Sequence, residues 1–205
     1  MIDTSIQKYC EALIKEFHTI SPQRRESLEQ IVAYCNDKKK ADKIIRLIYI
    51  CTHNSRRSHF GQVWAIVANV YYKKQITAYS GGTEATAFHI NAIDSLKRIG
   101  FKITTSDKGK NPIYKVKYGN QEKPIECFSK VFDHAHNPHS EFAAIMTCSD
   151  AEENCPFIPG AEFRIATTYD DPKVSDNTPD QDATYDNRCR QIAREVFYVF
   201  SKLNS

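Results

Sequence analysis

The sequence lacks the features by which several classes of protein are recognised. No apolar run approaches the roughly 20 residues that a membrane-spanning helix needs, and the first residues do not open a signal peptide. The formal net charge of +3 is too small to indicate a nucleic-acid-binding surface. No Gly-x4-Gly-Lys-Ser/Thr motif occurs, which excludes a Walker-type phosphate loop. We therefore expect a cytoplasmic globular protein with neither a membrane nor a nucleic-acid partner.

The length and the cysteine content further limit the classes of protein to which the chain can belong. At 205 residues the chain is expected to form one domain with room for an extension, and its 41% hydrophobic and 26% charged residues are ordinary for a globular protein. Seven cysteines, an odd number without a secretory signal, argue against a disulfide scaffold. They favour thiols with a redox or catalytic role.

The pattern of apolar residues predicts an α/β protein. Residues 1–42 form a predicted N-terminal helical extension of two helices, and residues 43–205 form the predicted catalytic domain. Strands and helices alternate in that domain, which predicts a parallel sheet. The predicted strands are residues 44–50, 75–80, 142–147 and 163–167, and the predicted helices begin near residue 60 and cover 91–99 and 185–203. Residues 101–132 interrupt this alternation and predict a small antiparallel insertion, with strands at 113–118 and 125–128.

The most informative stretch follows the first predicted strand. Cys51 ends the strand, and five residues separate it from Arg57, after which helical spacing begins. Backbone N–H groups of such a loop can surround an oxyanion, and the start of the helix adds its positive dipole end. Cys51 is then expected to react as a thiolate nucleophile, and Arg57 to bind oxyanion oxygens with two parallel donors. The alternative is that Cys51 is a small core residue followed by two solvated arginines.

Further reactive residues follow the third and fourth predicted strands. Cys148 comes directly after the third strand, and six residues separate it from Cys155 in a segment expected to be an acidic loop. Asp171 precedes a proline after the fourth strand. Because active residues of a parallel sheet gather beyond the carboxyl ends of the strands, we expect these side chains near Cys51. Asp171 is a candidate general acid. The alternatives are two unrelated loop thiols and an ordinary Asp-Asp-Pro turn.

A metal site is not predicted. The two cysteines after the third strand are not part of a Cys-x2-Cys pair and have no nearby histidine to complete a ligand set. His134, His136 and His139 precede that strand, so they are expected in a surface loop at the opposite end of the sheet from Cys51. No cofactor is predicted either.

Together these residues resemble the low-molecular-weight protein tyrosine phosphatase superfamily, and within it the thioredoxin-coupled arsenate reductases. The resemblance covers roughly residues 43–204. It depends on the Cys51-x5-Arg57-Ser58 loop, on Cys148-x6-Cys155 and on the Asp-Pro pair at Asp171. It implies a four-stranded parallel sheet with helices on both faces. The rest of the implied oxyanion-binding loop is Thr52, His53, Asn54, Ser55, Arg56 and Ser58.

The resemblance also implies a reaction. Cys51 would attack arsenate, Cys148 would attack Cys51 and release arsenite, and Cys155 would pass the oxidation to thioredoxin. Asp171 would be the acid, while Asn54 and Ser58 would shape the loop. The alternative is hydrolysis of a phosphate monoester, such as a phosphotyrosine, through a phosphocysteine on Cys51.

Three departures from the family pattern separate this chain from its compact members. Arg56 stands where the family commonly has a second loop cysteine. The N-terminal helical extension and the insertion at residues 101–132 are absent from the compact members. Such changes are compatible with a phosphorylated protein or metabolite as the substrate.

Overall fold

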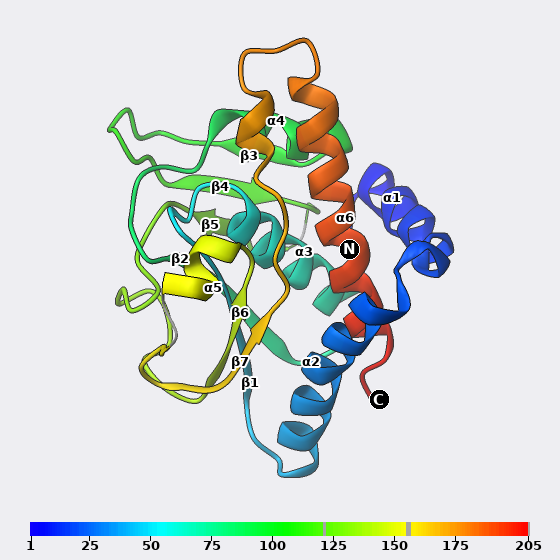
Figure 1. Cartoon of the computed structure of the whole chain (residues 1–205). Helices are drawn as coiled ribbons and strands as arrows, with labels where there is room; N and C mark the ends of the chain where they lie inside the picture. The colour runs from blue at the N-terminus through cyan, green and yellow to red at the C-terminus, as the bar shows by residue number, and fades with distance from the viewer. Residues whose placement is uncertain (121, 155–156, 205) are drawn as a thin grey trace.

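The computed structural model describes residues 1–120, 122–154 and 157–204 (Figure 1). Cys155, one of the predicted site residues, lies outside the described residues. The α-helices are α1 (Thr4–Lys15), α2 (Pro22–Lys40), α3 (Arg57–Tyr71), α4 (Ile90–Ile99), α5 (Ser149–Asn154) and α6 (Gln181–Ser201). Two short 3-10 helices are η1 (Phe17–Thr19) and η2 (Pro172–Ser175). None of the helices in the described ranges is long and apolar enough to cross a membrane.

A four-stranded parallel sheet forms the centre of the molecule, which confirms the predicted fold class. Its strands are β1 (Ile45–Cys51), β2 (Ile76–Gly82), β6 (Phe142–Met146) and β7 (Ala161–Ala166). Their order across the sheet is β2-β1-β6-β7, and each neighbouring pair is parallel. β1 is buried along nearly its whole length, which explains its continuous apolar sequence: a central parallel strand has both faces covered.

Helices cover both faces of the sheet, but unequally. One face carries the larger core, in which α3 and α6 pack with the fully buried Trp64, Tyr185 and Phe197. The other face carries a smaller cluster that includes Ile48 and Ile50 of β1 and is covered by α5. In Figure 1 α5 lies in front of the sheet, on the side away from α3. Cys51 belongs to the smaller cluster.

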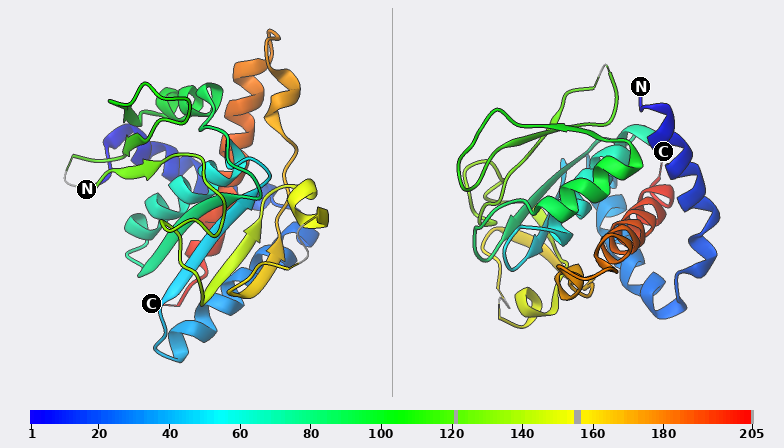
Figure 2. Two further views of the ribbon diagram at one scale, coloured as in Figure 1. Left: turned by 90° about the vertical axis from the view of Figure 1, so that its left-hand side faces the viewer. Right: turned by 90° about the horizontal axis from the view of Figure 1, so that it is seen from above.

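The N-terminal helices α1 and α2 pack against α6, and α2 also reaches β7 (Figure 2, right). Their apolar stripes belong to the same core as α3, so burial against α6 accounts for the helical periodicity of residues 1–42. Arg24 of α2 binds the buried Glu195 of α6, with 2.8 Å between Nε and Oε2, and its guanidinium lies 4.6 Å from the centre of the Tyr169 ring. The Tyr169 hydroxyl donates to the same carboxylate at 2.8 Å. The division of the chain after residue 42 stays a prediction.

The predicted antiparallel insertion is present. Its sheet consists of β3 (Lys102–Thr104), β4 (Tyr114–Lys117) and β5 (Ile125–Cys127), in that order. The sequence analysis missed β3, because a three-residue strand is too short to show a period of its own. The N-terminus joins this sheet, since the amide of Asp3 donates to the carbonyl of Tyr118 at 2.8 Å.

The prediction of an acidic loop after Cys148 is wrong. The residues directly after Cys148 form the short helix α5 rather than an irregular acidic loop. Asp150 and Glu152 stand in its first turn, where negative side chains interact favourably with the positive end of the helix dipole. Arg164 of β7 holds this helix by an ion pair to Glu152, with 2.7 Å between Nη2 and Oε2. The acidic composition therefore stabilises a helix start.

The buried ion pair between α2 and α6 gives a test of how far the extension supports the domain. Arg24→Met should lower the free energy of unfolding by roughly 3 kcal/mol, because it leaves a buried carboxylate without its cation. The Glu195 side chain is only 3% exposed. Urea unfolding measures the change.

Lys40→Met on the same helix is the matched control. Its partner Asp37 and Lys40 itself are 75% and 72% exposed, so the control should change the free energy of unfolding by less than about 0.5 kcal/mol. Equal, small changes in the two variants would show that the Tyr169 hydroxyl alone stabilises Glu195.

Candidate active site

The carboxyl ends of the parallel strands bring the predicted site residues to one edge of the sheet. In the register of β1 and β6, Ile50 pairs with Met146, so Thr52 and Cys148 stand two residues further along on adjacent paths. The amide of Thr147 donates to Ile50 O at 2.7 Å, and the amide of Tyr169 donates to Thr147 O at 3.1 Å. These bonds continue the ladder beyond the strands. They place the segments after β6 and β7 beside the Cys51 loop.

The loop itself is held by its carbonyl groups. Cys51 O and Thr52 O accept from the amides of Thr83 and Glu84, at 3.2 and 2.8 Å. Ser55 O accepts from the amide of His89 at 3.0 Å. With the carbonyls turned toward the surrounding segments, the amides turn toward the inside of the loop. Within the described ranges, no protein group accepts a hydrogen bond from the amides of residues 52–56. Such a concave set of donors is a binding surface for an anion.

Asn54 supports the turn of the loop. Its φ of +43° lies in the left-handed region, which asparagine tolerates better than most residues. Its side chain donates to Ser58 Oγ at 2.8 Å and accepts from the amide of Lys130 at 3.0 Å. Ser58 Oγ lies 3.1 Å from Cys51 Sγ. Because Asn54 uses a lone pair of that hydroxyl, the hydroxyl proton is available to a thiolate on Cys51.

Arg57 and Asp171 contact each other. Arg57 Nη2 lies 2.6 Å from Asp171 Oδ2, and Nη1 donates to the carbonyl of Tyr169 at 2.7 Å. The Arg57 side chain is 8% exposed and the Asp171 side chain 31%. Among the described residues, Arg57 Nε has no hydrogen-bond partner. The structure therefore brings together the predicted oxyanion-binding arginine and the predicted acid, whereas the neighbouring Asp170 binds Arg188 on the surface.

Cys148 lies next to the loop in the interior. Its Sγ is 3.4 Å from the hydroxyl of Thr52, and it shares the smaller buried cluster with Cys51. Cys51 is 3% exposed and Cys148 is fully buried. The amide of Ala151 in α5 points at Cys148 Sγ from 3.4 Å. Any reaction of Cys148 with an external partner therefore requires α5 to move.

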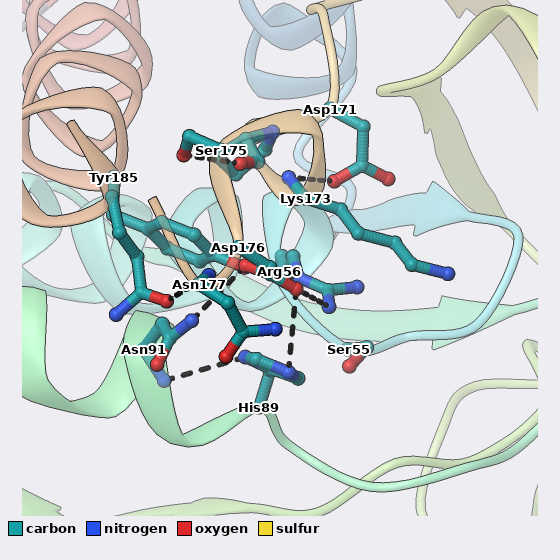
Figure 3. Close-up of polar contacts among 12 residues, drawn as sticks. Ser55, Arg56, His89, Asn91, Asp171, Lys173, Ser175, Asp176, Asn177 and Tyr185 are labelled. Atoms are coloured by element: carbon teal, nitrogen blue, oxygen red, sulfur yellow. Dashed lines mark hydrogen bonds and ion pairs between the residues drawn. The ribbon is translucent and has the colours of Figure 1, made fainter. Parts of the chain in front are cut away.

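Three side chains of the loop point away from its concave surface. His53 is 46% exposed and lies 3.5 Å from the Glu84 carboxylate. Ser55 Oγ donates to the carbonyl of Ala87 at 2.7 Å. Arg56 turns toward α6 and binds Tyr185 there (Figure 3). These residues contribute to the loop through their backbones.

The sequence analysis missed the contribution of the insertion. Ser129 donates its hydroxyl to the carbonyl of His53 at 2.7 Å. The adjacent Lys130 is 4% exposed, and no carboxylate of the described residues forms a salt bridge with it. Its ammonium lies 4.7 Å from the centre of the Phe128 ring. Burial lowers the pKa of Lys130 from its ordinary 10.5 to about 8. No local pattern marks Lys130, since Asn54 of the loop and Ser80 of β2, which it also contacts, lie far away in the sequence.

A glycine forms the wall of the loop. A Cβ on Gly82 would lie 2.5 Å from Thr52 O and 2.7 Å from the amide nitrogen of Asn54, both of them backbone atoms. Gly82 follows Ser80 and Gly81 at the end of β2, where the sequence analysis placed only the end of a strand. The close approach of two backbones explains why a glycine stands here.

The three histidines before β6 do not share one location. The carbonyl of His139 lies next to Gly160, at the beginning of β7 and away from the Cys51 edge, as expected. His134 and His136 instead contact the ring of Phe128, beside the outer strand β2, so their expected place at the opposite end is wrong. In the described part of the chain, no group of three or more potential ligands is placed to hold a metal ion.

With this geometry established, the chain can be compared with known proteins. No family model matches it. It is similar to the arsenate reductase of Bacillus subtilis (strain 168), with 26% identity over 144 residues, covering 70% of this chain and 86% of that protein. It is also similar to the arsenate reductase of Staphylococcus aureus (strain Newman), with 29% identity over 133 residues, covering 62% and 77% of the two proteins.

Solved structures show the same fold. An arsenate reductase from Archaeoglobus fulgidus matches with a TM-score of 0.50 and 16% identity, covering 76% of this chain and 98% of that one. A low-molecular-weight phosphotyrosine phosphatase from Vibrio cholerae matches with a TM-score of 0.50 and 11% identity, covering 77% and 94%. The chain therefore shares its fold with an arsenate reductase and with a low-molecular-weight phosphotyrosine phosphatase. Its sequence relatives named above are arsenate reductases, and the proteins to which it is similar are enzymes.

The buried Lys130 predicts a pH-dependent stability. Its pKa is lower in the folded protein than in the unfolded chain, so below about pH 8 both states are protonated and the folded state carries the full cost of burying the charge. Between about pH 8 and 10.5 this cost disappears as the folded state loses its proton first. Lys130→Met should therefore raise the free energy of unfolding near neutral pH, by roughly 3 kcal/mol, and the gain should vanish toward pH 10.5.

Urea unfolding of Lys130→Met and the parent at a series of pH values measures this difference. Groups that titrate identically in both proteins cancel in the comparison. The exposed Lys123→Met is the control and should change little at any pH. A Lys130→Met protein that is less stable than the parent at neutral pH would contradict the assignment of an uncompensated ammonium.

The close contact at Gly82 predicts a loss of oxyanion binding. Gly82→Ala must push the backbone of Thr52 and Asn54 inward, and displacements of this size cost roughly 10²-fold in kcat/KM. Protection of Cys51 from iodoacetamide by inorganic phosphate measures binding directly and should weaken. Gly109→Ala, whose added methyl would meet only the Asp107 side chain at 3.1 Å, is the control. Unchanged protection in Gly82→Ala would show that oxyanion binding does not depend on the close backbone contact at Gly82.

Proposed function

We propose that this protein is an arsenate reductase that forms a disulfide between Cys51 and Cys148. The observation that carries this proposal is a second buried thiol beside the oxyanion loop. Cys148 Sγ lies 3.4 Å from Thr52, the residue that follows Cys51. Sequence similarity to arsenate reductases of two bacteria supports it. A hydrolase would need no thiol at this position, since water discharges a phosphocysteine.

The first step uses the loop. Arsenate binds to the inward-facing amides of residues 52–56, and Arg57 turns its guanidinium fork from Tyr169 and Asp171 to the oxyanion. The Cys51 thiolate, oriented by Ser58, forms a bond to arsenic, and a hydroxyl of arsenate leaves with a proton. Asp171 is the donor of that proton, because release from Arg57 leaves its carboxyl group beside the loop. Substrate binding thus frees the acid.

The second step uses the neighbouring thiol. The Cys148 thiolate attacks Cys51 Sγ, the sulfur–arsenic bond breaks, and its electron pair stays on arsenic, which is reduced and leaves as arsenite. A Cys51–Cys148 disulfide remains. Two electrons have passed from two thiols to one arsenic atom, so the products balance. Cys148 lies next to Thr52, the residue that follows Cys51, and in the same buried cluster as Cys51, so the two thiols start from neighbouring positions.

Regeneration requires a reductant outside this chain. We propose that Cys155, which lies outside the described residues, attacks Cys148 and that thioredoxin reduces the resulting Cys148–Cys155 disulfide. The burial of Cys148 under α5 means that this helix must open first. The ion pair between Arg164 and Glu152 holds α5 to β7 in the reduced protein and is the contact that opening would break.

Phosphate monoester hydrolysis is the second candidate function. The contact between Arg57 and Asp171 favours it, because those two residues and Cys51 are all that a phosphocysteine route needs. Cys51 would displace an alkoxide that Asp171 protonates, and water would then release phosphate. In this case Cys148 would be a buried residue with no part in the reaction.

Cys148→Ser separates the two functions. If the protein is a reductase, the variant should lose arsenate turnover completely, since nothing remains to discharge the arsenic on Cys51. Hydrolysis of an aryl phosphate should remain within about threefold of the parent, since that route does not use Cys148. Arsenite release with thioredoxin and its reductase is assayed beside phenol release.

The matched control is Cys189→Ser, which removes a buried thiol that binds Trp64 and belongs to the larger core, whereas Cys51 and Cys148 belong to the smaller cluster. It should retain both activities in the folded fraction. Full arsenate turnover by Cys148→Ser would refute the relay. Hydrolysis by the parent without any arsenate turnover would establish the second function instead.

A further inference from the structure

Arg56 is buried in a hydrogen-bonded cluster outside the oxyanion loop (Figure 3). Its Nε donates to the hydroxyl of Tyr185 at 2.7 Å, and its Nη2 lies 3.3 Å from Asp176 Oδ2. The Tyr185 hydroxyl donates in turn to Asp176 Oδ1 at 2.7 Å. These three side chains close a triangle between the loop, the end of η2 and the beginning of α6. Arg56 as a whole is 8% exposed.

Helix α4 completes the cluster. Asn91 donates its side-chain amide to Asp176 Oδ1 at 3.0 Å, and His89 Nε2 lies 3.9 Å from Asp176 Oδ2. The backbone of His89 also binds the loop, through its amide and Ser55 O. Asp176 is therefore held from three elements, and the pKa of its carboxyl group is lowered by Tyr185, Asn91 and Arg56 against the opposing effect of burial.

Two consecutive loop arginines thus hold the two ends of one segment. Arg57 binds its beginning, at Tyr169 O and Asp171, and Arg56 binds its end, at Asp176. In the proposed reaction Arg57 releases Asp171 when it binds the oxyanion. Arg56 is not drawn away in the same manner, because its side chain points away from the concave surface of the loop. It binds the Tyr185 hydroxyl and Asp176, and Tyr185 and Asn91 also hold that carboxylate.

We propose that Arg56 is a positioning residue that keeps Asp171 beside the Cys51 loop after Arg57 has turned to the oxyanion. This inference rests on the proposed function, because it needs Asp171 as the acid. It assigns a purpose to the arginine at a position where the family commonly has cysteine. The sequence analysis placed Arg56 in the implied oxyanion-binding loop and assigned its side chain no partner.

Two variants test the proposal without leaving an unpaired charge. Tyr185→Phe removes two bonds of the triangle and changes no charge. The double variant Arg56→Met with Asp176→Asn removes the ion pair and keeps the net charge. The matched control is Arg98→Met with Asp186→Asn, a pair 2.7 Å apart that also joins α4 to α6 but has no contact with the loop.

Aryl phosphates with different leaving groups distinguish a misplaced Asp171 from a general loss of stability. 4-Nitrophenyl phosphate needs little protonation of its leaving group, whereas phenyl phosphate needs the acid. In both test variants kcat/KM for phenyl phosphate should fall about tenfold more than for 4-nitrophenyl phosphate, because general acid catalysis is worth 10²–10⁴ and is only partly lost. Inhibition by inorganic phosphate should stay within about twofold, since the loop amides and Arg57 are intact.

Equal losses on both substrates, or no loss on either, would overturn the proposal. The control pair should leave the ratio of the two substrates unchanged. A parent protein that neither hydrolyses aryl phosphates nor turns over arsenate would refute the proposed function, and a second measurement then judges Arg56 separately.

Hydrogen exchange provides that measurement, since it needs no activity. With saturating inorganic phosphate, the amides of Lys173, Asp176 and Thr178 should exchange about tenfold faster in both test variants than in the parent. These amides donate to Asp171, Lys173 and Ser175. Exchange in the middle of α3 should not change. Unaltered exchange of the segment would show that Arg56 does not hold it, whatever the enzyme's activity.

Discussion

The orientation of the loop carbonyls is the constraint on which the rest of the site depends. Among the described residues, no group of a neighbouring segment accepts a hydrogen bond from the amides of residues 52–56. The carbonyls of the loop accept hydrogen bonds from Thr83, Glu84, His89 and Ser129. Because a peptide unit is planar, turning each carbonyl outward turns amides of the loop inward. The anion-binding surface is thus produced by the walls around the loop. Gly82 is needed because one of those walls approaches the loop within backbone contact.

Charge is distributed around this surface in pairs. Arg57 and Asp171 form one pair and Arg56 and Asp176 another, and both arginines follow directly on the loop amides. Both arginine side chains are about equally buried, at 8% and 10% exposed, so the two pairs differ in their other contacts. Arg57 can turn to an oxyanion that competes with Asp171. Asp176 is bound by Tyr185 and Asn91 as well as by Arg56, so the second pair stays in place. The Arg57–Asp171 pair is suited to a part in the reaction, and the Arg56–Asp176 pair to holding the segment in place.

The two additions to the compact fold support the same edge of the sheet. The insertion reaches the loop through Ser129 and Lys130, and the N-terminal extension reaches Tyr169 through Arg24 and Glu195. Tyr169 is also the residue whose carbonyl binds Arg57. The insertion therefore contacts the loop itself, and the extension contacts Tyr169, a partner of Arg57. This arrangement explains how a chain with a fold shared by smaller proteins accommodates two further segments beside its site.

The sequence by itself determined the strand, the loop and the helix around Cys51, and the meeting of Cys51, Cys148 and Asp171 at one edge. These follow from local periodicity and from the rule that parallel strands share their carboxyl ends. Only the tertiary structure decided the partners of the charged side chains. The two residues of the Arg57–Asp171 pair are 114 positions apart, and those of the Arg56–Asp176 pair are 120 apart. No local pattern encodes such contacts, because the two side chains of a pair come together only when the packing of the elements that carry them has placed them side by side.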